Sequence, residues 1–155
     1  MPQDTATEAL AFTHTLPITV QIFDTDCYGV MWHGSYIKWL EMGRVQYFAE
    51  LGYTLPGPAD RPCHVFPVVN QNLTFRSPGQ LWATLNLTTQ LRIDRSRLIF
   101  EQTFTCGSTQ KTIMTAETTC AIVEATDEGQ WKPLRKLPDT VQHALNKAAN
   151  LNSNS

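Results

Sequence analysis

The stretch from Gly34 to Leu51 has the sequence GSYIKWLEMGRVQYFAEL, and it decides which folds the chain can adopt. Ser35 lies where a helix cap is favoured, and Gly52 follows where a left-handed residue ends a helix. The stretch therefore predicts one long helix of about 27 Å.

Apolar side chains point in nearly every direction around this predicted helix. The polar residues Lys38, Glu41, Arg44, Gln46 and Glu50 do not gather into one stripe. An amphipathic surface helix would place its polar residues on one side. We therefore expect a buried helix that other elements surround. Its apolar members are Tyr36, Ile37, Trp39, Leu40, Met42, Val45, Tyr47, Phe48, Ala49 and Leu51.

Strand patterns flank the helix on both sides. Before it, residues 17–23 alternate apolar and polar side chains. After a proline-rich loop, four more strands are predicted at 68–76, 81–93, 97–106 and 111–125, with short turns between them. Short turns make successive strands antiparallel neighbours in a meander, and the absence of crossover helices excludes a parallel sheet. The predicted fold class is α+β, with an antiparallel sheet wrapped around one long central helix.

The length of 155 residues allows one domain with loose ends. We expect a polar N-terminal lead at 1–14, the domain itself at 15–137, and a short C-terminal helix and tail at 138–155. In this last helix Val141, Leu145 and Ala148 lie on one side.

Charge is scarce in this chain. Charged residues make up 17% of it, against a usual share of roughly 25%. The net charge is −2, so no basic surface for nucleic acid is visible. The first residues lack the positive start of a secretory signal, and no stretch approaches the ~20 apolar residues of a membrane helix. The cysteines Cys27, Cys63, Cys106 and Cys120 show no metal-ligand spacing. We expect a cytoplasmic protein with free thiols, no metal, no cofactor, no membrane insertion and no nucleic-acid partner.

One segment before the helix carries residues capable of chemistry. Residues 24–36 have the sequence DTDCYGVMWHGSY, in which Asp24 and Asp26 close a strand, Gly29 follows, and His33 lies just before the helix. The unpaired N–H groups of a helix N-terminus can polarise a carbonyl oxygen, while a nearby carboxylate attacks the carbonyl or activates water. The same spacing also fits two turn or cap residues and a structural histidine.

This segment resembles the motif of the hotdog-fold thioesterases of the 4-hydroxybenzoyl-CoA type. The resemblance rests on the motif at 24–36 and on the order of elements from Leu16 to Ala125. It implies hydrolysis of an acyl-CoA or acyl-ACP thioester, with Asp26 as the catalytic carboxylate. It also implies that Gly29, His33 and Tyr36 bind substrate, with the backbone N–H near His33 polarising the thioester carbonyl.

Several points stay open at the level of sequence. Cys27 and Tyr28 stand where the family usually has small residues or proline, so the acyl group, fatty or aromatic, is not determined. CoA and acyl carrier protein remain alternative carriers, and Asp26 is either a nucleophile or a general base. Basic residues near the carrier phosphates would come from Arg76, Arg92, Arg95 and Arg97.

Three other functions compete with thioester hydrolysis. A hotdog domain that only binds an acyl thioester would need no carboxylate beside its pocket. A phosphatase of the haloacid dehalogenase type also places Asp-x-Asp after an apolar strand, but it needs Mg²⁺ and a parallel sheet. A serine hydrolase lacks support because the chain contains no Gly-x-Ser-x-Gly.

The low charge also bears on assembly. A single hotdog sheet leaves edge strands and one face open, and the resemblance implies that subunits cover them by pairing. We therefore expect a homo-oligomer, a dimer or a homotetramer, with the site between two chains.

Overall fold

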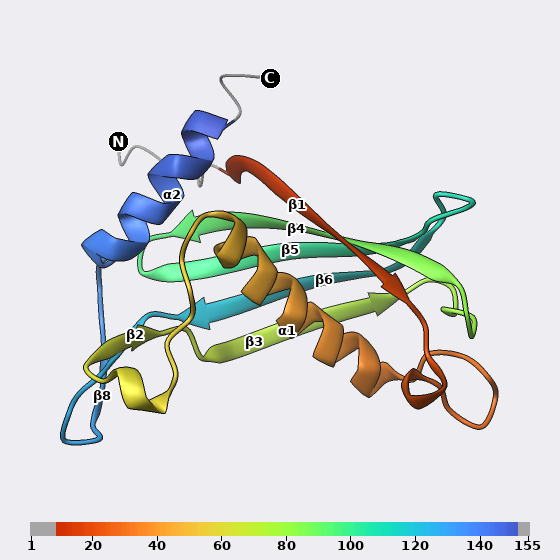
Figure 1. Ribbon diagram of the computed structural model, residues 1–155, viewed down its shortest axis with the longest axis horizontal. Helices are drawn as coiled ribbons and strands as arrows, with labels where there is room; N and C mark the ends of the chain where they lie inside the picture. Colours follow the sequence, from red (N-terminus) through yellow and green to blue (C-terminus); the bar gives the residue numbers. More distant parts are fainter. Residues whose placement is uncertain (1–8, 152–155) are drawn as a thin grey trace, which may run out of the picture.

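The computed structural model describes residues 9–151 and contains one large antiparallel sheet. Its strand order is β1-β4-β5-β6-β3. Helix α1, His33–Glu50, lies across one face of this sheet (Figure 1). The predicted α+β fold is confirmed, and the antiparallel pairing excludes the haloacid dehalogenase alternative. The strands are β1 (Ala9–Thr19), β3 (Val68–Phe75), β4 (Thr84–Asp94), β5 (Arg97–Cys106) and β6 (Thr112–Ala121).

Smaller elements complete the structure. The short strands β2 (Cys63–Val65), β7 (Val123–Ala125) and β8 (Trp131–Pro133) form a second sheet in the order β2-β7-β8. The one-turn 3-10 helices are η1 (Ile22–Asp24) and η2 (Pro58–Asp60). Helix α2, Asp139–Leu151, buries Val141, Leu145 and Ala148 in the core, as their spacing predicted.

The first strand begins and ends earlier than the expected 17–23. β1 begins at Ala9, within the stretch 1–14 that we expected to be a polar lead, and it ends at Thr19, so that Ile22 and Phe23 belong to η1 and not to the strand. From Thr13 to Thr19 it pairs in continuous register with β4, and this backbone pairing extends the sheet toward the N-terminus. Residues 1–8 of the lead and 152–155 of the tail lie outside the described residues.

The core is built on one side of α1. Tyr36 and Leu40 pack in one cluster with Phe104, and Tyr47 and Phe48 pack in another that also includes α2. The opposite side of the helix is not covered, since Ile37 is 41% and Met42 is 39% exposed. The expectation of a helix surrounded on all sides is therefore wrong within one chain, because its single large sheet covers only one helix face.

Helix and sheet approach each other closely at Gly43. A Cβ atom at this position would lie 2.7 Å from both Gln102 Nε2 and Leu87 Cδ2, and 3.0 Å from Thr89 Oγ1. Glycine is required here for space, because contacts under 3 Å force neighbouring atoms to move.

A buried polar network crosses the same interface. Arg44 is only 5% exposed, and its guanidinium donates to Gln102 Oε1 at 3.4 Å and to Thr118 Oγ1 at 3.5 Å. It also pairs with Glu41 one turn earlier. Gln102 Nε2 in turn donates to the Leu40 carbonyl at 3.0 Å. The sheet thus satisfies the polar groups that α1 brings into the core.

The chain from β3 to β4 does not form the expected hairpin. β3 pairs with β6 at the edge of the sheet, whereas β4 lies between β1 and β5. The connecting residues pair instead with the loop before α1. The Gly79 carbonyl accepts the Met31 N–H at 2.8 Å, and Gln80 forms a bridge with Val30. The predicted meander is correct only for β4, β5 and β6.

Two further expectations concern cysteines and membranes. Cys27, Cys63, Cys106 and Cys120 are all free thiols. Within residues 9–151 no helix has the length and apolar character needed to cross a membrane.

We expect Gly43→Ala to lower the free energy of unfolding by about 1–3 kcal/mol, because the added methyl group overpacks the contact between α1 and the sheet. Urea denaturation measures this effect. Met42→Ala, at the neighbouring and partly exposed position, should change the value by only about 0.5 kcal/mol. Equal stability of Gly43→Ala and the wild type would contradict the close approach.

Candidate active site

Asp26 lies in a tight loop between η1 and α1. Its backbone N–H donates to the Val30 carbonyl at 3.0 Å, and its carbonyl accepts the Gly29 N–H at 3.1 Å. The side chain is exposed, and its Oδ1 accepts the Tyr28 N–H at 2.8 Å. Its other oxygen, Oδ2, has no hydrogen-bond partner among the residues that the structure describes. The loop therefore presents a carboxylate with one oxygen free for chemistry.

The N-terminus of α1 lies beside this loop. Trp32 is the cap residue, and its side chain makes no capping hydrogen bond. The first N–H groups of a helix have no carbonyl partner within the helix, and the helix dipole adds positive potential there. The N–H groups of His33 and Gly34 are consequently available to an oxygen atom that needs donors.

A cavity of about 310 Å³ joins the loop, the helix start and the crossover after β3. Its walls are mostly apolar. The lining residues are Asp26, Met31, Trp32, His33, Tyr36, Phe75, Ser77 and Pro78.

Tyr36 is the most deeply buried part of this wall. The side chain is 2% exposed, and its hydroxyl accepts the Gly79 N–H at 3.0 Å. Its ring makes edge contacts with Phe75 at 5.4 Å and with Phe104 at 5.3 Å between centroids. Burial raises the pKa of Tyr36, and the Gly79 hydrogen bond only partly offsets this. The tyrosine is a neutral structural wall of the cavity.

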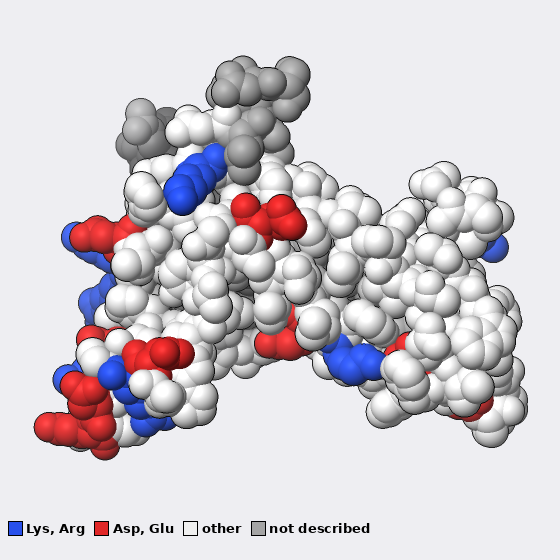
Figure 2. Space-filling model, viewed as in Figure 1, with Lys and Arg blue, Asp and Glu red and all other residues white. Residues whose placement is uncertain are grey.

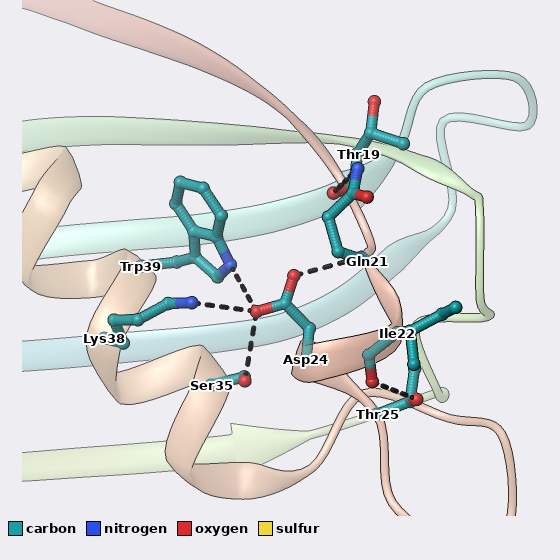
Figure 3. Close-up of polar contacts among 8 residues, drawn as sticks. All are labelled: Thr19, Gln21, Ile22, Asp24, Thr25, Ser35, Lys38 and Trp39. Atoms are coloured by element: carbon teal, nitrogen blue, oxygen red, sulfur yellow. Dashed lines mark hydrogen bonds and ion pairs between the residues drawn. The ribbon is translucent and has the colours of Figure 1, made fainter.

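Asp24 is held differently from Asp26, although both belong to the same motif. It is fully buried, and its Oδ1 accepts from Ser35 Oγ at 3.1 Å, Lys38 Nζ at 2.9 Å and Trp39 Nε1 at 3.2 Å. Its Oδ2 accepts the Gln21 N–H at 3.0 Å. Figure 3 shows these donors converging on the carboxylate from α1 and from Gln21, which lies between β1 and η1.

The environment of Asp24 keeps it ionised. Burial alone would raise its pKa, but the Gln21 N–H, the Lys38 ammonium and the Ser35 hydroxyl together outweigh burial and lower the pKa below its ordinary value. The Asp24 carbonyl also accepts the Trp32 N–H at 3.0 Å. Through its side chain and its carbonyl, Asp24 therefore connects both ends of the loop that carries Asp26 to the start of α1.

The structure brings together three of the four expected site residues. Asp26, His33 and Tyr36 line the same cavity. Gly29 is not among the lining residues. It has a φ of +72°, and a Cβ there would meet nothing within 4 Å, so glycine serves the backbone conformation of the turn.

The arginines considered for a phosphate site are separated. Arg92 pairs with Glu101 and Glu117 on the sheet, Arg95 lies in the turn between β4 and β5, and Arg97 is the first residue of β5. This turn lies at the opposite end of the sheet from the start of α1 (Figure 1). Within one chain, only Arg76, next to the lining residues Phe75 and Ser77, adjoins the cavity.

The part of the cavity wall that comes from the end of β3 was not predicted from the sequence. Phe75, Ser77 and Pro78 line the cavity because the crossover pairs with the loop before α1. The turn formers Ser77, Pro78 and Gly79 were the available signal, but their composition equally suits a hairpin.

Charged residues are unevenly distributed over the surface. On the face drawn in Figure 2, acidic and basic side chains are most numerous near the small β2-β7-β8 sheet, and a smaller group of both signs lies beside the start of α1.

Residues 20–145 match the thioesterase-like superfamily. The chain belongs to this superfamily. In Synechocystis, the protein named "Putative esterase sll0410" is 31% identical over 131 residues, which are 84% of this chain and 76% of that protein.

Solved structures with the hotdog fold are also similar. The DHNA-CoA thioesterase from Staphylococcus aureus has a TM-score of 0.75 and 22% identity, with 92% of this chain and 94% of that chain covered. A mutant 4-hydroxybenzoyl-CoA thioesterase complexed with 4-hydroxybenzoyl-CoA has a TM-score of 0.72 and 18% identity, with 85% and 98% covered. At these identities the likeness establishes the hotdog fold.

We expect Asp24→Asn to lower the free energy of unfolding at pH 7 by about 1.5–3 kcal/mol, the range for hydrogen bonds to a charged group. The lowered pKa means that the ionised carboxylate stabilises the fold above the pKa of the unfolded chain, near 3.9, and that this stabilisation is lost as the pH falls through the folded pKa. The difference between variant and wild type should therefore shrink below about pH 4.

Urea denaturation at a series of pH values measures this difference, with the exposed Asp127→Asn as the matched control. A deficit for Asp24→Asn that stays constant down to pH 2 would show that the charge of Asp24 does not stabilise the fold.

Proposed function

We propose that this protein is a thioesterase that hydrolyses an acyl-CoA or acyl-ACP thioester, with Asp26 as its catalytic residue. One observation carries the proposal: the free carboxylate oxygen of Asp26 and the N-terminus of α1 border the same mostly apolar cavity. These are the two groups that acyl transfer needs, a base or nucleophile and an oxyanion donor.

In the proposed reaction, the thioester carbonyl oxygen accepts hydrogen bonds from the N–H groups of His33 and Gly34. Asp26 either attacks the carbonyl carbon to form an anhydride, which water then cleaves, or removes a proton from the attacking water. The C–S bond breaks, and the thiolate leaves with the electron pair of that bond. Because a thiolate is a good leaving group, the reaction does not require a strong general acid.

The cavity also suggests the character of the acyl group. Met31, Trp32, Tyr36 and Phe75 make an apolar wall that favours an uncharged hydrocarbon or aromatic group over a polar one. The names of both structural relatives contain an aromatic acyl-CoA, which supports CoA as the carrier. A panel of benzoyl, naphthoyl and fatty acyl thioesters on CoA and on acyl carrier protein would identify both parts of the substrate.

We further propose that two copies pair along β3. It is an edge strand of the large sheet, and its side chains Val68 and Val69 are 45% and 53% exposed. Phe75 at the end of β3 lines the cavity, so a second copy would border the site. Light scattering should give a dimer or tetramer mass, and a 17.5 kDa monomer that hydrolyses thioesters would contradict this pairing.

We expect Asp26→Asn to lower kcat at least a hundredfold with little change in KM, because general-base assistance is worth about 10²–10⁴ in rate. Release of free thiol in steady state measures it, and Asp127→Asn serves as the exposed control. Near-normal turnover of Asp26→Asn would overturn the assignment. A wild-type protein that binds acyl thioesters without releasing thiol would instead be a binding protein.

His33→Ala separates the backbone donor from the side chain. The variant keeps the N–H at this position and removes only the imidazole, so we expect kcat to fall less than about tenfold, well short of the loss caused by Asp26→Asn. The same thiol-release assay compares the two variants. A loss in His33→Ala as large as that in Asp26→Asn would assign the chemistry to the imidazole.

A further inference from the structure

The indole ring of Trp32 lies directly over the first turn of α1. A Cβ atom built on Gly34 would lie 2.1 Å from Cη2, 2.2 Å from Cζ3 and 2.7 Å from Cζ2 of that ring. The ring also meets the His33 imidazole edge-on, at 5.4 Å between centroids. Trp32 is 43% exposed and forms part of the cavity wall.

Gly34 is present for space and not for backbone conformation. It is the second residue of α1, where an alanine would be more favourable for the helix itself. Gly29 is the opposite case, with a positive φ and open space around its missing Cβ. The contact with the indole is therefore the physical reason for glycine at position 34.

The backbone of Trp32 cannot shift to make room for a larger residue. Its N–H donates to the Asp24 carbonyl at 3.0 Å, and its carbonyl accepts the Ser35 N–H at 3.0 Å. The indole itself can rotate about its side-chain bonds. A methyl group at position 34 would consequently push the ring away from the helix while the fold remains intact.

We propose that Trp32 is a specificity-determining residue and that Gly34 is the positioning residue that lets its ring lie against the helix start. This rests on the proposed function, because the ring lies against the helix start whose N–H groups would hold the thioester carbonyl. An acyl group bound there would contact the indole as part of the cavity wall. Aromatic contacts of this kind are worth about 0.5–1.5 kcal/mol, which corresponds to a factor of about 2–13 between substrates.

The test is a double-mutant cycle with Trp32→Ala, Gly34→Ala and the double variant. Two quantities are measured: the ratio of kcat/KM for benzoyl-CoA to that for hexanoyl-CoA, and the ratio of the Kd values for their non-hydrolysable thioether analogues. We expect Trp32→Ala and Gly34→Ala each to change both ratios several-fold. Adding Gly34→Ala to Trp32→Ala should change them no further, because the methyl group then has no ring to displace.

Trp82→Ala is the matched control. Trp82 is 57% exposed and is not among the residues that line the cavity, so its removal should leave both ratios unchanged. Two results would overturn the proposal: unchanged ratios in Trp32→Ala, or the same effect of Gly34→Ala with and without the indole.

The two readouts separate this proposal from the proposed function. If the wild type binds the analogues but hydrolyses neither thioester, the thioesterase assignment fails, and the Kd ratios alone decide the role of Trp32. If the wild type hydrolyses thioesters and Trp32→Ala changes neither ratio, only the proposal about Trp32 and Gly34 fails. If the protein neither binds nor hydrolyses these compounds, both are overturned.

Discussion

The buried carboxylate of Asp24 connects the segment just after β1, the first turns of α1 and the loop that carries Asp26. Its two oxygens take donors from Gln21 on one side and from Ser35, Lys38 and Trp39 on the other. Moving the loop relative to the helix would separate a buried charge from its partners, which costs several kcal/mol. The position of Asp26 beside the helix N-terminus depends on this constraint.

The same contacts show how differently the two aspartates of one motif are held. Every oxygen of Asp24 that could act on a substrate already accepts a hydrogen bond, and the side chain is fully buried. Asp26 is exposed, with one oxygen held by the Tyr28 N–H. Spacing alone does not separate these cases, because Asp-x-Asp looks the same whichever residue is the structural one. The resemblance to thioesterases indicated Asp26, and the contacts supply an independent physical reason for that choice.

Most of the fold was predictable because its signals are local. The helix predicted at 34–51 is α1 at His33–Glu50, and the strand predicted at 97–106 is β5 with the same bounds. The helix was predicted from the end signals at Ser35 and Gly52, and the strand from its alternating side chains. The path from β3 to β4 was not predictable, because Ser77, Pro78 and Gly79 suit a hairpin and their actual partner is the loop at 25–31, far earlier in the chain. This long-range pairing also brings Ser77 and Pro78 into the cavity, so the missing part of the fold and the missing part of the site have one cause.

The few charged residues of the chain are unevenly distributed. Arg44 lies buried between α1 and the sheet, where Gln102, Thr118 and Glu41 satisfy it. On the face seen in Figure 2, the other charges gather mainly near the small sheet, with a smaller group beside the start of α1. Beside the start of α1, the Lys38 ammonium already pairs with the buried Asp24 at 2.9 Å. The exposed Asp26 therefore borders the mostly apolar cavity without a salt bridge among the residues that the structure describes.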